Sequence, residues 1–296
     1  MRTRPDPYAL TDLRRHLAEA SLRAVPAARD SAESGQVSFG APALDGALGG
    51  GIARAALHEV YAPATADLVA ATGFAIGLAI RAAGLRPILW VRQDVVDAET
   101  GRLHPPGLTE LGLDPGRVLL VRARDAEGVL RAGSEAARCP ALGAVLIEPW
   151  GEPRRLDLTA SRRLSLAAEG SGATTLLLRA AVSPQASAAR TRWQVAALPS
   201  RALEANAPGD PAFSLRLLRH RGGLGEREWC VEWSRDRQSF EDSDLRDHQA
   251  ARGRHGRADQ ARASPDAASL SRDVVPFPAD RPAAAGASHP DIRRAG

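Results

Sequence analysis

Short apolar runs separated by helical patterns are the feature that most limits how this chain can fold. The early runs are almost continuously apolar and rich in Val, Ile and Leu, and helical patterns lie between most of them. Continuous apolar strands that alternate with helices are typical of a parallel sheet covered on both faces. The sequence therefore predicts an α/β fold with a mostly parallel sheet flanked by helices. The predicted strands are residues 57–61, 87–92, 118–122, 143–147 and 174–179.

The pattern changes after residue 180. The runs 190–198, 213–221 and 228–234 alternate apolar with polar residues and follow one another without helical patterns between them. Such alternation indicates antiparallel strands with one face exposed to solvent. We expect these strands to extend the same sheet at its C-terminal edge, so that residues 36–234 form one domain.

Both ends of the chain differ from this core. Residues 1–35 contain an amphipathic helical pattern, with Thr11 as a candidate N-cap, followed by a polar linker. Its apolar face could pack on the chain's own body or on another protein, and the second alternative makes it a candidate partner-binding helix. Residues 235–296 have few large apolar side chains, so we expect a disordered tail. The residues of the candidate partner-binding helix are Leu10, Leu13 and Leu17.

Arginine is the only basic residue besides histidine. All 39 Lys-plus-Arg residues are Arg, and the formal net charge is +4. The absence of lysine excludes every mechanism that needs a side-chain amine, such as a Schiff base. Cys139 and Cys230 lack metal-ligand spacing, so we expect buried thiols and no metal site. With neither a signal-peptide pattern nor a long apolar span, we expect a soluble cytoplasmic protein without membrane contact.

A strand, a loop and a helix occupy residues 57–83, where a nucleotide-binding protein would carry a phosphate loop. That loop would read G-x-x-x-x-G-K-[ST], because glycine amides and a lysine bind the phosphates. The loop here has no glycine and no lysine, Pro63 lacks an amide donor, and Asp67 would repel a phosphate. We therefore expect no nucleotide cofactor. The degenerate loop consists of Ala62, Pro63, Ala64, Thr65, Ala66 and Asp67.

Several segments resemble the core of RecA-type ATPases. Leu44-Asp45 with the glycines that follow, then ALHEVY, PILWVRQD, GAVLIEP and TTLLLR, are similar to that core, and the similarity covers about residues 40–235. The ImuA family is the one that three segments resemble most in sequence: ILWVRQD, LDLTASRRLSLAAE and LRHRGG…EWCVEW. These are RecA-like factors of bacterial SOS mutagenesis, sometimes labelled SulA-like. The resemblance implies a RecA-like fold.

The departures from an active RecA-type ATPase fall on its functional positions. By this resemblance, Gln93 replaces the acid that orients the attacking water, with Asp94 adjacent and the register open. Arg179 replaces the glutamine that senses the γ-phosphate. Glu148 remains as a Walker B-like carboxylate, but without the loop and its lysine it has no phosphate-bound metal ion to hold. We expect no ATP hydrolysis and no enzymatic activity.

The segments that would contact DNA in a recombinase are short in this chain. Only residues 149–155 and 180–192 remain of them, and both contain arginines that could contact a phosphate backbone or a partner protein. The alternative is that these are ordinary loop cations. The candidate contacts are Arg154, Arg155, Arg179, Arg190 and Arg192.

The family resemblance implies a function. We expect a non-catalytic accessory protein of SOS-induced translesion synthesis. It would scaffold an ImuB-type homologue of the Y-family polymerases and an error-prone DNA polymerase III α-subunit, with RecA as a further candidate partner and weak DNA contact. Two alternatives remain open: a SulA-like inhibitor of cell division, and a residual DNA-stimulated ATPase.

Overall fold

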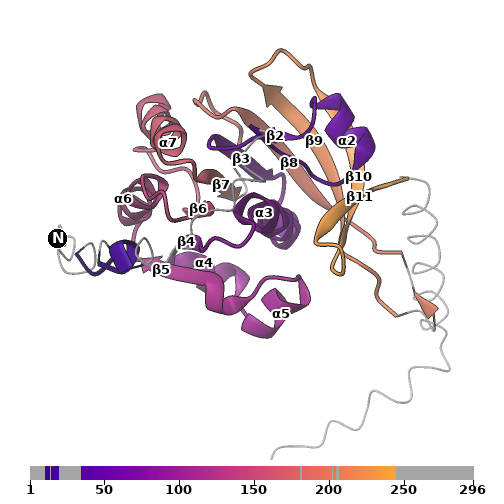
Figure 1. Ribbon diagram of the computed structural model, residues 1–296, viewed down its shortest axis with the longest axis horizontal. Coiled ribbons are helices and arrows are strands. Elements are labelled where there is room, and N and C mark those ends of the chain that lie inside the picture. Colours follow the sequence, from indigo (N-terminus) through magenta and orange to yellow (C-terminus); the bar gives the residue numbers. More distant parts are fainter. Residues whose placement is uncertain are drawn as a thin grey trace, which may run out of the picture. The chain divides into compact units, whose positions relative to one another are not determined.

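A nine-stranded sheet forms the centre of the computed structural model, which describes residues 11–13, 15–19, 35–180, 182–201, 203–204 and 207–244. The strand order is β11-β10-β9-β8-β3-β7-β6-β4-β5, so the first long strand lies in the middle (Figure 1). The strands are β3 (Leu57–Ala62), β4 (Ile88–Gln93), β5 (Val118–Ala123), β6 (Ala144–Glu148), β7 (Thr174–Ala180), β8 (Thr191–Leu198), β9 (Ala212–His220), β10 (Arg227–Ser234) and β11 (Ser239–Ser243). A separate antiparallel pair joins β1 (Gln36–Val37) and β2 (Ile52–Ala53).

The expected fold class is confirmed. Strands β3 to β7 pair in parallel, and β9, β10 and β11 pair antiparallel at the C-terminal edge. Strand β8 joins the two parts, because it is parallel to β3 on one side and antiparallel to β9 on the other. The prediction of antiparallel strands from residue 190 onward is therefore wrong for the β3–β8 pair and correct from the β8–β9 pair onward. Alternation reports which faces of a strand are buried, but not its direction.

Helices cover both faces of the parallel part of the sheet. Helix α3 (Leu68–Ala83) packs on one face, against β6, β7 and β8, whereas α6 (Ala126–Ala137) and α7 (Leu158–Ser171) pack on the other (Figure 1). The shorter helices are α2 (Pro42–Ala47), α4 (Asp94–Thr100) and α5 (Pro105–Glu110), with 3₁₀ turns η2 (Thr65–Asp67) and η3 (Pro115–Arg117). Pro105 begins α5, because a proline fits the first position of a helix.

Side-chain caps set the ends of the two helices on the second face. Asp125 accepts a hydrogen bond from the amide of Gly128 at the start of α6, at 2.7 Å. Asp157 does the same for Ala160 at the start of α7, also at 2.7 Å. Gly172 ends α7 in the left-handed conformation, with φ of 82°. An Asp directly before a helical pattern therefore marks the start of each of these helices in the sequence.

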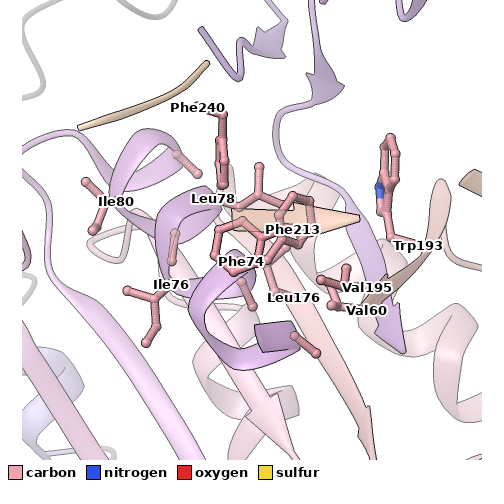
Figure 2. Close-up of a cluster of buried hydrophobic side chains, with 14 of the residues drawn as sticks. Val60, Phe74, Ile76, Leu78, Ile80, Leu176, Trp193, Val195, Phe213 and Phe240 are labelled. Atoms are coloured by element: carbon pink, nitrogen blue, oxygen red, sulfur yellow. The ribbon is translucent and has the colours of Figure 1, made fainter. Parts of the chain in front are cut away.

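An aromatic cluster lies between α3 and the antiparallel part of the sheet (Figure 2). Phe74 of α3 lies 5.2 Å from Phe240 and 6.2 Å from Phe213, measured between ring centroids. Gly77 permits this packing, because a Cβ there would lie 2.7 Å from the Phe240 ring. Phe240 belongs to β11 and is fully buried. The domain boundary expected at residue 234 is therefore too early, and residues 235–244 belong to the core rather than to a tail.

Two helices differ from what the sequence led us to expect: the apolar helix at residues 65–83 and the candidate partner-binding helix. Residues 65–83 are long and apolar enough to cross a membrane by length and composition alone, but 61% of that window is buried in the protein, as in the core helix of a folded domain. Of the candidate partner-binding helix, Leu13 and Leu17 are only 7% exposed and pack on the second face with α6 and α7. Leu10 lies outside the described residues, as does the expected tail from residue 245 onward.

Candidate functional site

The carboxyl ends of parallel strands are where α/β proteins usually bind ligands, and the degenerate loop lies at this edge. It runs from the end of β3 through η2 into α3. Residues 63–66 are exposed, and Asp67 precedes α3 without capping it. Instead, the Asp67 carboxylate accepts a hydrogen bond from the amide of Ala197 in β8, at 2.9 Å. The residue that would repel a phosphate thus attaches the turn to the neighbouring strand.

The glycine cluster before β3 is a backbone turn rather than a ligand cradle. Gly51 has φ of 125°, and a Cβ there would lie 2.1 Å from the carbonyl oxygen of Val37. The adjacent Asp45 carboxylate accepts hydrogen bonds from the amides of Phe39 and Gly40, at 2.7 and 2.9 Å. These contacts fix the segment between β1 and β2, and the amides of Gly49 and Gly50 donate to the backbone carbonyls of Gly46 and Asp45.

Glu148, the Walker B-like carboxylate, is buried at the end of β6 and is already paired. Its Oε2 accepts hydrogen bonds from Nε of Arg92 at 2.7 Å and from the indole of Trp90 at 3.0 Å. Arg92 also donates to Asp97 at 2.6 Å and to Thr100 at 3.1 Å. All of these side chains lie on the α3 face of the sheet or in α4. The carboxylate is therefore the acceptor of an internal ion-pair network.

Burial raises the pKa of Glu148, and the charge and hydrogen bond of Arg92 act against that rise. The guanidinium occupies the place at which a cation would neutralise the carboxylate. A divalent metal ion would have to displace Arg92, which would then be buried without this partner. Within the described ranges, no cluster of three His, Cys, Asp or Glu side chains has the arrangement of a metal site.

The register at the end of β4 is now defined. Gln93 is the last residue of the strand, and its Oε1 accepts a hydrogen bond from the amide of Trp150 at 3.0 Å. Asp94 begins α4 and pairs with Arg122 at 3.4 Å, with both side chains about half-exposed. Gln93 therefore fixes the loop after β6 to the end of β4, a structural role for the position at which the resemblance suggested a missing catalytic acid.

A second ion-pair network lies on the opposite face of the sheet, between the middle of β3 and the start of β8. Oε2 of Glu59 in β3 accepts hydrogen bonds from Arg192 and Ser187 at 2.9 Å each, and from the Tyr61 hydroxyl at 3.2 Å. Burial, followed by the nearby Glu59 charge, raises the pKa of Tyr61 to about 12. This network was not among the sequence predictions. The signal for it is Glu59 itself, a glutamate inside an otherwise apolar strand, since a buried carboxylate requires a partner.

Arg179 also lies against Tyr61, with its guanidinium carbon 5.7 Å from the ring centroid. The residue is 3% exposed, and its Nε and Nη2 make no hydrogen bond to the residues that the structure describes. Arg192 lies 5.9 Å from the same ring. Neither arginine is available to a phosphate backbone on the surface, so the expectation that these two contact DNA is not supported.

The remaining candidate contact arginines are exposed but do not lie together. Arg154 and Arg155 are on the loop after β6, at the carboxyl edge, and Arg155 pairs with Glu127 at 2.9 Å. Arg190 precedes β8, and its amide donates to the carbonyl of Leu57 at the start of β3. Because β8 and β3 are parallel, Arg190 lies at the opposite, amino edge of the sheet. The structure therefore does not bring the predicted set into one surface.

His58 forms a further buried polar contact between β3 and β8. Its Nε2 lies 2.8 Å from the carbonyl oxygen of Ala53, and its Nδ1 lies 2.7 Å from the Thr191 hydroxyl. Burial lowers the pKa of His58 to about 4. The ring is therefore neutral at neutral pH, and a tautomer with the proton on Nε2 satisfies both contacts.

These observations define a class: an α/β protein in which Glu148, the buried carboxylate at the ligand-binding edge of the sheet, is paired with an arginine. Within that class, the chain belongs to the ImuA family. It is 33% identical to Protein ImuA of two Caulobacter vibrioides strains over 218 residues, which is 68% of this chain and 78% of each relative. No family model matches the chain. A crystal structure of the RadB recombinase matches 71% of this chain and 100% of its own, with 17% identity and a TM-score of 0.49.

Proposed function

We propose that this chain is a non-catalytic, RecA-like accessory protein of SOS-induced, error-prone translesion DNA synthesis. Membership of the ImuA family supports the damage-response setting. The observation that carries the non-catalytic role is the Arg92–Glu148 pair, at 2.7 Å in the core. It places a guanidinium against the one carboxylate that a RecA-type ATPase would use near its metal ion.

The turn after β3 supports the same proposal. A phosphate needs several amide donors and a cation, and the exposed residues 63–66 offer neither glycine nor lysine. Asp67 adds a negative charge at the start of α3, where a helix would otherwise attract an anion. A protein with this edge acts through its surfaces rather than through hydrolysis. Its proposed role is to scaffold partners in the cytoplasm.

The proposed partners are an ImuB-type homologue of the Y-family polymerases and an error-prone DNA polymerase III α-subunit. RecA is a further proposed partner, and direct DNA contact is a minor part of the proposal. A folded body with rigid helices on both faces of a sheet suits this role, because binding then costs little conformational entropy. Because Leu13 and Leu17 are buried, we propose that partners bind the exposed helices rather than the apolar face of the N-terminal helix.

Affinity capture from DNA-damaged cells tests the proposal. The tagged full chain is expected to recover both polymerase components, whereas an unrelated tagged α/β protein of similar charge should not. Failure to recover either component, under conditions in which both are expressed, contradicts the scaffolding role. A parallel assay of ATP hydrolysis, with and without single-stranded DNA, tests the non-catalytic role, and turnover above the protein-free background would contradict it.

A further inference from the structure

A groove between α6 and α7 lies on the second face of the described structure. Two hollows form it, of about 250 and 430 Å³. Arg163 of α7 lines both of them, so they adjoin at this side chain. The two helices pack side by side on the same side of the sheet (Figure 1). The groove is therefore built on rigid elements.

Apolar side chains line part of the groove, and together they are called its floor. Leu130 of α6 and Leu164 of α7 line the first hollow, and Leu166 and Ala167 line the second. Leu166 is 67% exposed, one of the few large apolar side chains in the described residues that are this open to water. Covering such a side chain would contribute to binding at about 25 cal/mol per Å² of apolar area removed from water.

The rim of the groove is mainly basic. Among its acids, Glu127 already pairs with Arg131 and Arg155, at 3.3 and 2.9 Å, and Glu135 lies 3.9 Å from Arg138. Arg163 makes no hydrogen bond or ion pair in the described part of the chain. The hollows are lined by more arginines than acids, and the charged residues among the lining are Glu127, Arg131, Glu135, Arg138, Arg155 and Arg163.

We propose that this groove docks an acidic amphipathic segment of a partner protein. An apolar side chain of that segment would cover Leu166 and fill the floor, and a carboxylate would pair with Arg163. The inference rests on the proposed scaffolding function and names the surface that performs it. A nucleic acid fits less well, because a phosphate backbone would use the basic rim but leave the leucines of the floor uncovered.

Fluorescence anisotropy with a defined probe tests the groove directly. The probe is a labelled synthetic helix of about 15 residues, with leucines on one face and Asp and Glu elsewhere. It is titrated with the full chain, with Arg163→Glu and with Leu166→Asn. Arg163 and Leu166 are both exposed, so the fold should be retained in each variant. Circular dichroism verifies this. The matched controls are Arg219→Glu at the exposed Arg219 of β9 and Leu85→Asn at the 93% exposed Leu85.

The expected result is a weakening of about tenfold or more by Arg163→Glu and by Leu166→Asn, since each removes one half of the complementarity. The controls should change affinity by less than about twofold. A second peptide with Gln in place of every acid should bind more weakly to the unaltered chain and be insensitive to Arg163→Glu. Absence of binding by the acidic peptide, or equal effects in the groove and control variants, overturns the proposal.

Two further arms separate the alternatives. A labelled single-stranded oligonucleotide that binds and loses affinity with Arg163→Glu, but not with Leu166→Asn, would assign the groove to nucleic acid and overturn the peptide proposal. Capture of the polymerase components by the unaltered chain and equally by both groove variants would also overturn it, while leaving the proposed function intact. Loss of capture by the unaltered chain itself would instead contradict the proposed function.

Discussion

The sheet and the α6–α7 groove differ in whether their arginines are paired within the protein. In the sheet, buried Arg92 pairs with Glu148 at 2.7 Å, and Arg192, whose side chain is 11% exposed, pairs with Glu59 at 2.9 Å. In the groove, Arg163 is at the surface beside exposed Leu166 and has no partner within the described ranges. At the edge where this type of fold usually binds a ligand, the Arg92–Glu148 pair instead stabilises the protein itself. On α7, by contrast, the exposed charge of Arg163 remains available to another molecule.

Removing the cation of the buried network should have the largest effect. Arg92→Met leaves Glu148 and Asp97 without their shared partner, and Glu148 is buried. Breaking a buried pair in this way typically costs about 3–5 kcal/mol, so the free energy of unfolding should fall by that amount. Urea denaturation monitored by tryptophan fluorescence measures it.

Two variants sharpen this prediction. The double variant Arg92→Met/Glu148→Gln should recover part of the loss, because no carboxylate is then left unpaired at β6. Arg155→Ala removes a surface pair with Glu127 and should change stability by less than about 0.5 kcal/mol. A cost for Arg92→Met as small as that of Arg155→Ala would show that the edge is not an internally held network.

Acid should destabilise the protein through His58. The unfolded state takes up the proton near the ordinary pKa of 6.5, whereas the folded state does so only near 4. The unfolded state therefore binds more protons between these values, so this contribution is complete above pH 6.5 and is lost as the pH falls to 4. The difference corresponds to about 3 kcal/mol at 1.36 kcal/mol per unit.

Comparison with His58→Gln isolates this effect. The raised pKa of Glu148 acts in the opposite direction, favouring the folded state in acid, but it is common to both proteins. The free energy of unfolding of the unaltered chain should therefore fall more steeply between pH 6.5 and 4 than that of the variant, as measured by urea denaturation at several pH values. Parallel curves for the two proteins would show that His58 is not held neutral by its buried site.

A smaller effect is expected at the turn after β3. Asp67→Ala removes the acceptor of the Ala197 amide, at a site that is only half-buried. The loss should be about 1 kcal/mol, and Asp67→Asn, whose side-chain oxygen can still accept this hydrogen bond, should lose less. Thermal unfolding measures both. A stabilising effect of Asp67→Ala would mean that the charge at the start of α3 is only tolerated rather than used.

The sequence was sufficient for the fold because burial and capping are local signals. The run 143–147 and the cap at Asp125 each predict one element from adjacent residues, and both elements are present. The signals failed where a contact is distant in sequence. Phe240 is buried against α3 in the structure, yet its neighbours in the sequence are polar, so β11 was assigned to the tail.

The candidate site could be predicted less well than the fold. The positions of the degenerate loop and of Glu148 follow from strand ends, which the sequence marks. That Arg179 is buried, that Arg192 lies against Tyr61, and that Arg190 lies at the amino edge of the sheet all depend on strand order and on the direction of β8. An arginine in a loop and an arginine stacked on Tyr61 look alike in a sequence.

The smallest expected effect concerns nucleotide at the emptied edge. A ligand stabilises a folded protein by RT ln(1 + [L]/Kd), so millimolar Mg-ATP should raise the melting temperature by less than about 1 °C if its Kd exceeds about 10 mM. Asp67→Ala should respond no more than the unaltered chain, because removing one repulsive charge supplies neither a lysine nor glycine amides. Tripolyphosphate serves as the control for general anion binding by exposed arginines. A shift that grows with Mg-ATP but not with tripolyphosphate would show that the edge still recognises a nucleotide, and the contrast with the open α6–α7 groove would then fail.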